Sequence, residues 1–193
     1  MLVKRCEKTG LDFTTEESTV VRNYVVDNEG VVGDIHYKMI PVGHSLPGAC
    51  SFLLECNGKK ILYTGDIRFS GRNEPNLDAY VGKIGTKFVD VMLCEGTRID
   101  SDKTITEDDV KKDIVDRTRG VKGLVFVDFG WKDTTRFTTM LEVARETGRT
   151  LVIDPKLAYL LFELHSQFPL KFTNPLDEPD VRVYKKRSGD MLY

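Results

Sequence analysis

The chain has 193 residues, 40% of them hydrophobic and 30% charged, so it can form one ordinary soluble domain or two small ones. The formal net charge of −2 argues against a simple basic nucleic-acid-binding module, because affinity for phosphate backbones comes from an excess of Lys and Arg. No apolar run approaches the roughly 20 residues of a membrane span, and the N-terminal residues lack the pattern of a signal peptide. We therefore expect no membrane association, a cytoplasmic location and four reduced cysteines.

The first half of the chain carries the signals of β-strands. Residues 19–26 and 35–42 are predicted strands, with a turn at residues 27–30 between them. Residues 88–93 are almost continuously apolar. Such a run predicts a strand that is covered on both faces of its sheet.

A β-hairpin is predicted between these strands. Asn57-Gly58 separates two runs with strand character, residues 51–56 and residues 59–63. Asn-Gly supplies the two positive-φ residues that a type I′ turn requires. This turn should set the register of the two strands locally.

Three helices are predicted in the second half. Thr106 and Asp109 have the spacing of a capping box, and the helix that they open should end at Gly120. Asp154-Pro155 is typical of an N-cap followed by Pro at the first helical position. The second helix has an apolar stripe of Phe137, Met140, Leu141 and Ala144 and should end at Gly148. The third helix, which follows Asp154-Pro155, has a stripe of Leu157, Leu160, Leu161 and Leu164.

Strands are predicted between these helices, a buried one at residues 124–129 and two more at residues 150–153 and 181–184. The βαβαβ succession predicts a parallel, right-handed, Rossmann-like layer. The change of pattern near residue 100 divides the chain into two expected domains, residues 1–100 and residues 101–193.

Three polar side chains, His44, Asp66 and Glu95, each lie in a Gly-rich turn just past an apolar run. A carboxylate such as Asp66 can bridge two divalent cations about 3.5–4 Å apart, and a neutral imidazole such as His44 is a metal ligand. Glu95 could orient a neighbouring ligand from a strand end. The alternatives are an ordinary turn at Asp66, a loop histidine without a ligand role, and a Glu95 carboxylate bonded to its own turn.

The combination of these blocks resembles the metallo-β-lactamase superfamily and, more narrowly, the β-CASP nucleases, which include ribonuclease J and the endonuclease of pre-mRNA 3′-end cleavage. The blocks are Gly-His-Ser-Leu-Pro-Gly-Ala (43–49), Tyr-Thr-Gly-Asp-Ile-Arg (63–68) and Cys-Glu-Gly-Thr (94–97). Residues after 100 are similar to the opening of a β-CASP domain.

The resemblance implies an α/β fold: part of a metallo-β-lactamase αββα sandwich, followed by the Rossmann-like start of a β-CASP domain. It also implies two zinc ions in the complete protein, with His44 as a zinc ligand and Asp66 as the bridging ligand. Glu95 would assist catalysis with Asp66. RNA-directed members of the family usually carry Glu at this place, so Glu95 favours RNA as the substrate.

The family's His-x-His-x-Asp-His motif is absent from this chain. We therefore expect either a piece of a longer protein that supplies the motif or a degenerate relative, with zinc bound weakly or not at all by these residues alone. Arg68 could bind a substrate phosphate, although a surface ion pair is an equal alternative. Lys122 and the basic run 185–187 could add affinity for a nucleic-acid backbone.

These observations predict a zinc-dependent phosphodiester hydrolase, a nuclease acting on RNA. One alternative is a non-catalytic nucleic-acid-binding or scaffolding relative of the same fold. Another is a lactamase-fold hydrolase acting on a small ester or thioester. An uncovered sheet edge would also favour a homodimer.

Overall fold

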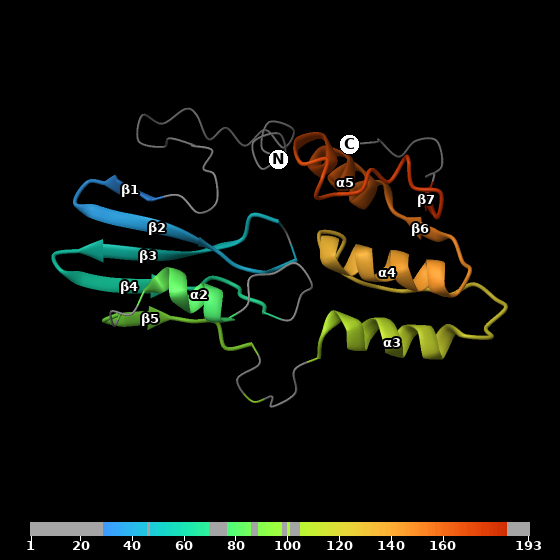
Figure 1. The fold of residues 1–193 in the computed structure, drawn as a ribbon, viewed down its shortest axis with the longest axis horizontal. Coiled ribbons are helices and arrows are strands. Elements are labelled where there is room, and N and C mark those ends of the chain that lie inside the picture. The colour runs from blue at the N-terminus through green and yellow to red at the C-terminus, as the bar shows by residue number, and fades with distance from the viewer. Residues whose placement is uncertain are drawn as a thin grey trace.

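The computed structural model shows a mixed α/β protein with two groups of packed elements (Figure 1). A five-stranded sheet with helix α2 forms the sheet half, residues 29–97, and helices α3, α4 and α5 with a two-stranded sheet form the helical half, residues 105–184. No helix in the described part of the chain combines the length and apolarity that a bilayer crossing requires. The structure describes residues 29–45, 47–69, 77–85, 89–97, 100 and 105–184.

The large sheet has the strand order β1-β2-β3-β4-β5, so each strand lies beside its neighbour in the chain. The first four strands pair antiparallel, whereas β5 pairs parallel with β4. The strands are β1 (Glu29–Val32), β2 (Ile35–Pro41), β3 (Cys50–Cys56), β4 (Lys59–Tyr63) and β5 (Val91–Leu93).

The predicted hairpin is confirmed. Strands β3 and β4 pair from Cys56 opposite Lys59 to Phe52 opposite Tyr63. Asn57 and Gly58 have φ values of 50° and 72°, as a type I′ turn requires. The strand predicted at residues 35–42 is also present, as β2.

Two other predictions for this half are corrected. Glu29 and Gly30 belong to β1, and the turn that joins β1 to β2 lies at Gly33-Asp34, where Gly33 has a φ of 59°. Residues 19–28 lie outside the described residues. Strand β5 is predicted to be buried on both faces, but all three of its side chains are 48–54% exposed. It pairs with β4 at the end of the strand order, where fewer neighbours cover it.

Helix α2 (Leu77–Ile84) covers one face of the sheet. Its Tyr80 packs into a cluster with Ile40 and Val42 from the end of β2. Gly85, with a φ of 92°, ends the helix. This cluster lies under the loops that follow β2 and β4.

The helical half contains the three predicted helices and a parallel strand pair. Thr106 and Asp109 form both hydrogen bonds of a capping box, and the α3 helix ends before Gly120, which has a φ of 80°. Asp154 caps α5, with Pro155 at the first helical position. The elements are α3 (Glu107–Thr118), α4 (Thr134–Glu146), β6 (Leu151–Ile153), α5 (Pro155–Gln167) and β7 (Val181–Val183).

The core of this half joins α4, α5 and the strand pair β6-β7. Four residues of the predicted stripes lie in this core: Phe137, Leu141, Leu157 and Leu161. Met140 packs instead against α3, and Leu164 is half-buried. Strands β6 and β7 pair in parallel around α5, so the last βαβ unit of the predicted succession is confirmed.

The buried strand predicted at residues 124–129 is wrong. This segment joins no sheet, and Leu124 and Phe126 are 77% and 89% exposed. Just before this segment, the backbone carbonyls of Val121 and Gly123 accept hydrogen bonds from the Arg149 guanidinium. An apolar run predicts burial but does not specify a partner strand, so the first strand of the predicted βαβαβ layer does not form.

Candidate metal site at the strand ends

Two loops of the sheet half meet at the ends of β2 and β4. The backbone N–H of Arg68 donates to the carbonyl of Gly43 over 2.8 Å, which forms an isolated antiparallel bridge between the loops. His44 follows this bridge in one loop, and Asp66 lies two residues before it in the other. The bridge therefore fixes the two candidate ligands next to each other.

His44 Nε2 and Asp66 Oδ2 are 3.7 Å apart. The other ring nitrogen, Nδ1, lies 3.1 Å from the Ser45 hydroxyl oxygen. When Nδ1 carries the ring proton and donates a hydrogen bond to the Ser45 hydroxyl oxygen, the Nε2 lone pair is available to a metal ion. The two side chains are 38% and 73% exposed, so a cation could reach them from solvent.

The separation fits a shared zinc ion. Two ligands at about 2.1 Å from one ion in a tetrahedral arrangement are about 3.4 Å apart, close to the observed distance. The described residues contain no group of three or more His, Cys, Asp and Glu side chains that could hold a metal ion. The described site thus brings together two candidate ligands, His44 and Asp66.

Buried polar side chains support the strand end that carries Asp66. Thr64 is fully buried at the end of β4, where its carbonyl accepts a hydrogen bond from Ser51 Oγ over 2.7 Å. Ser51 Oγ also lies 2.9 Å from the Tyr80 hydroxyl oxygen, and burial raises the pKa of Tyr80 above its ordinary value. Gly65 then turns the chain with a φ of 59°. Ser51 and Tyr80 are not predictable from the sequence as part of this support, because nothing in their local pattern distinguishes them from other strand and helix residues.

Glu95 holds the loop that contains Asp66. Its Oε1 accepts a hydrogen bond from the Ile67 backbone N–H over 2.6 Å, and its Oε2 accepts one from Thr97 Oγ1 over 2.7 Å. Glu95 thus bonds to its own turn and to the residue that follows Asp66, whereas its role in orienting a metal ligand stays a prediction. Parallel pairing of β5 with β4 brings the two strand ends together.

Arg68 forms an ion pair with Asp133, at the start of α4, with Nη1 and Oδ2 3.1 Å apart. The Arg68 side chain is 22% exposed and that of Asp133 is 14% exposed. The ion pair that was the alternative to phosphate binding is thus formed, and it is largely buried. Phosphate binding by Arg68 stays a prediction.

A second, more buried ion pair lies behind this one. Glu107 is 4% exposed, and its carboxylate accepts hydrogen bonds from the Arg136 guanidinium and from Thr139 Oγ1. Burial raises the pKa of Glu107, whereas the hydrogen bonds from Arg136 and Thr139 lower it. With the added charges of Arg136 and Arg68, the pKa lies below its ordinary value of 4.5.

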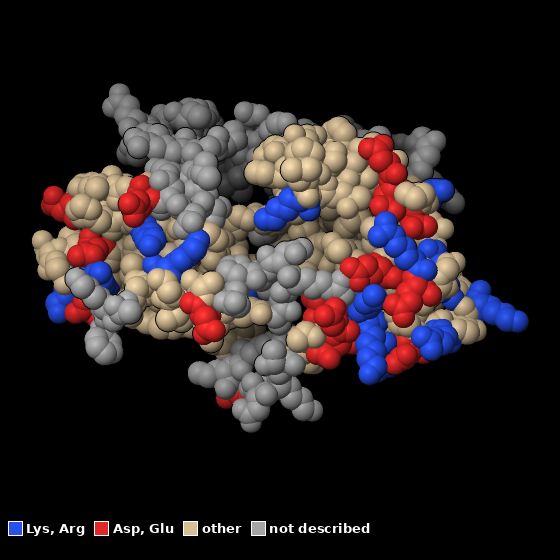
Figure 2. Space-filling model, in the orientation of Figure 1, with Lys and Arg blue, Asp and Glu red and all other residues tan. Residues whose placement is uncertain are grey.

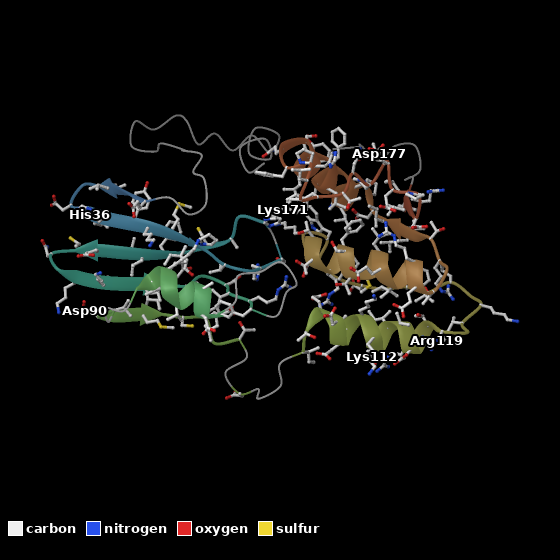
Figure 3. The ribbon with its side chains drawn as sticks, viewed as in Figure 1. His36, Asp90, Lys112, Arg119, Lys171 and Asp177 are labelled. Carbon is white, nitrogen blue, oxygen red and sulfur yellow. The ribbon has the colours of Figure 1, made fainter. Side chains whose placement is uncertain are left out.

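The other histidines of the chain lie elsewhere. His36 is on β2, away from the helical half (Figure 3). His165 Nδ1 lies 2.7 Å from the carbonyl oxygen of Phe172, beside an open pocket of about 360 Å³ that no residue of the candidate site lines. These histidines are separate from the pair of His44 and Asp66.

Charge on the helical half is mixed. Figure 2 shows acidic and basic side chains interspersed over α3 and α4 on the face in view. Lys122 is exposed, and residues 185–187 lie outside the described residues. Among the described residues on this face, no broad basic patch for a nucleic-acid backbone is present.

No family model matches the sequence, and no curated protein matches it. The fold is similar to the crystal structure of a protein of unknown function from Enterococcus faecalis V583, with a TM-score of 0.61 and 22% sequence identity. The match covers 89% of this chain and 44% of that one, so this chain spans less than half the length of the other protein. The similarity shows a shared fold.

Proposed function

We propose that this chain is part of a zinc-dependent phosphodiester hydrolase that acts on RNA in the cytoplasm, with the metallo-β-lactamase and β-CASP arrangement that its sequence motifs resemble. The observation that supports the proposal best is the 3.7 Å separation of His44 Nε2 and Asp66 Oδ2. These residues are 22 positions apart in the chain, and the Gly43–Arg68 bridge brings them together at the end of one sheet.

The roles of the residues follow from their contacts. His44 would bind zinc through Nε2 while Ser45 orients its ring through Nδ1. Asp66 would hold the metal through its exposed carboxylate, and Glu95 would fix the loop behind it. Zinc, when bound, lowers the pKa of a water ligand to about 7, so that hydroxide is available to attack phosphorus. Further zinc ligands would come from outside the described residues.

The decisive experiment measures cleavage of labelled RNA by the complete protein. Asp66→Asn should lower the rate by about a thousandfold or more, because the carboxylate that holds the metal is lost. Asp34→Asn, which changes an exposed carboxylate in the β1–β2 turn, is the matched control and should cleave like the wild type. Full activity of Asp66→Asn would contradict the assignment.

Calorimetry with zinc completes this test. The isolated chain should show no micromolar zinc site, because two ligands bind zinc weakly. A tight site in the isolated chain would show that other ligands, with the cysteines as the first suspects, complete the coordination. Cleavage of a small thioester and not of RNA would favour the small-molecule hydrolase.

A second candidate function is a non-catalytic relative that binds nucleic acid. The absence of a third metal ligand among the described residues favours it. It predicts that the complete protein retards labelled RNA in a gel without cleaving it, at any zinc concentration.

A further inference from the structure

The first turn of α4 contacts both loops of the candidate site. The backbone N–H of Thr134 donates to the carbonyl of Ser45 over 3.2 Å, and the preceding residue, Asp133, accepts a hydrogen bond from Arg68 Nη1 over 3.1 Å. Ser45 is adjacent to His44, and Arg68 is two residues beyond Asp66. Two consecutive residues of the helical half thus bond to the two loops that carry the candidate ligands.

The Asp133 carboxylate has two partners at once. Its Oδ1 accepts a hydrogen bond from the Arg136 backbone N–H over 2.9 Å, which caps α4, while Oδ2 accepts from Arg68. Because the side chains of Asp133 and Arg68 are largely buried, solvent screens their attraction less than it screens an exposed pair. The start of α4 and the loop of Asp66 are therefore held at a defined separation.

The start of α4 is itself fixed. Arg136, in the first turn, binds the buried carboxylate of Glu107, the first residue of α3. Thr139, one turn further along α4, donates to the same carboxylate over 2.7 Å. Apolar side chains of α3 and α4 pack together below this network. Because α4 is anchored in this way, its first turn restrains the positions of the loops that it contacts.

We propose that Asp133 is a positioning residue for the candidate metal site: through Arg68 it holds the Asp66 loop, while Thr134 holds the His44 loop. The pair of ligands then depends on the docking of the helical half, and separating the two halves releases it. The link to metal binding rests on the proposed function, whereas the link between the helix and the loops rests on the contacts alone.

The test compares two N-cap substitutions. Asp133→Asn keeps a good N-cap for α4 but removes the charge that pairs with Arg68. Asp154→Asn makes the same change at the cap of α5, which has no ion-pair partner among the described residues. Amide hydrogen exchange, measured by NMR, reports on the Arg68 and Thr134 N–H groups. Asp133→Asn should accelerate exchange of both by about tenfold, and Asp154→Asn should leave both unchanged.

Exchange in Asp133→Asn at the wild-type rate would overturn the proposal. Arg68→Gln removes the same ion pair from the other side and should accelerate the Thr134 amide to a similar extent. The double variant should be no faster than either single variant, because both remove one interaction. Additive effects would show that the two residues act independently, and would also overturn the proposal.

A zinc titration of the isolated chain, followed by the His44 ring signals, tests the link to the metal. The half-saturating zinc concentration should be about three- to tenfold higher in Asp133→Asn than in Asp154→Asn. An equal concentration in both would refute the positioning role. If zinc at millimolar concentration leaves the His44 signals of the wild type unchanged, the weak binding that the proposed function assigns to this chain is contradicted, while the exchange rates still decide whether α4 holds the loops.

Discussion

The sheet half and the helical half cover their apolar residues to different extents. In the helical half, the residues at helical spacing are mostly buried in two packed clusters, and Phe137 and Leu161 are 2% and 1% exposed. In the sheet half, Leu62 pairs with Leu53 on the face that α2 covers and is 3% exposed, whereas its neighbours on the other face, Ile61 and Tyr63, are 37% and 50% exposed. Strand β5 is exposed on both faces, because Met92, beside Leu62, is 54% exposed, as is Leu93 beside Tyr63.

The difference shows what local pattern controls in each half. An amphipathic helix carries one apolar stripe, and the stripe itself tells which face is buried. An apolar strand has two faces. Its pairing is set by backbone hydrogen bonds and by turns such as Asn57-Gly58, so the strand forms whether or not other elements bury either face. The strand prediction for residues 88–93 succeeded in placing a strand and failed on its burial for this reason.

The largest expected effect tests this contrast on adjacent residues. Leu62→Ala should destabilise the protein by about 3 kcal/mol, because it opens a cavity under α2. Ile61→Ala, one residue away on the open face, should cost about 1 kcal/mol or less. Urea denaturation at pH 7 measures both. Equal losses would mean that both faces of β4 are packed in solution.

A smaller effect is expected at the anchor of the helical half. Glu107→Gln should cost about 2–3 kcal/mol at pH 7, because it leaves the Arg136 charge without its buried partner. The folded-state pKa of Glu107 lies below its ordinary value of 4.5, so the unfolded chain takes up the proton first as the pH falls.

The stabilisation by Glu107 is therefore fully present above about pH 4.5 and is lost as the pH falls through the lower folded-state pKa. Denaturation curves of the wild type and Glu107→Gln should accordingly converge below pH 4.5. A gap that stays constant with pH would show that the carboxylate contributes packing and not charge.

The smallest effects sharpen the comparison between turn and helix. Gly58→Ala should cost about 1 kcal/mol, because alanine is strained at a φ of 72°. Gly82→Ala, inside α2, should instead stabilise by about 0.5–1 kcal/mol, since a Cβ there meets nothing within 4 Å. Thermal unfolding distinguishes the opposite signs. A loss in both variants would show that α2 does not form as described.

The candidate site was predicted in part. Strand-end placement in Gly-rich turns selected His44, Asp66 and Glu95, and the structure brings the first two within 3.7 Å while Glu95 holds the Asp66 loop. Asp133 was not selected, because it lies 67 positions beyond Asp66 and its sequence context is that of an ordinary N-cap. Its contact with Arg68 exists only once α4 lies against the sheet half.

The sequence by itself determined the features that depend on neighbours in the chain: the hairpin, the capped helices and the stripes that they bury. These depend on backbone conformations and spacings of a few residues, which a local pattern contains. Tertiary structure alone decided that residues 124–129 join no sheet, that β5 keeps an open face and that α4 contacts both ligand loops. Each of these depends on which distant surface a segment meets, and no local spacing encodes that choice.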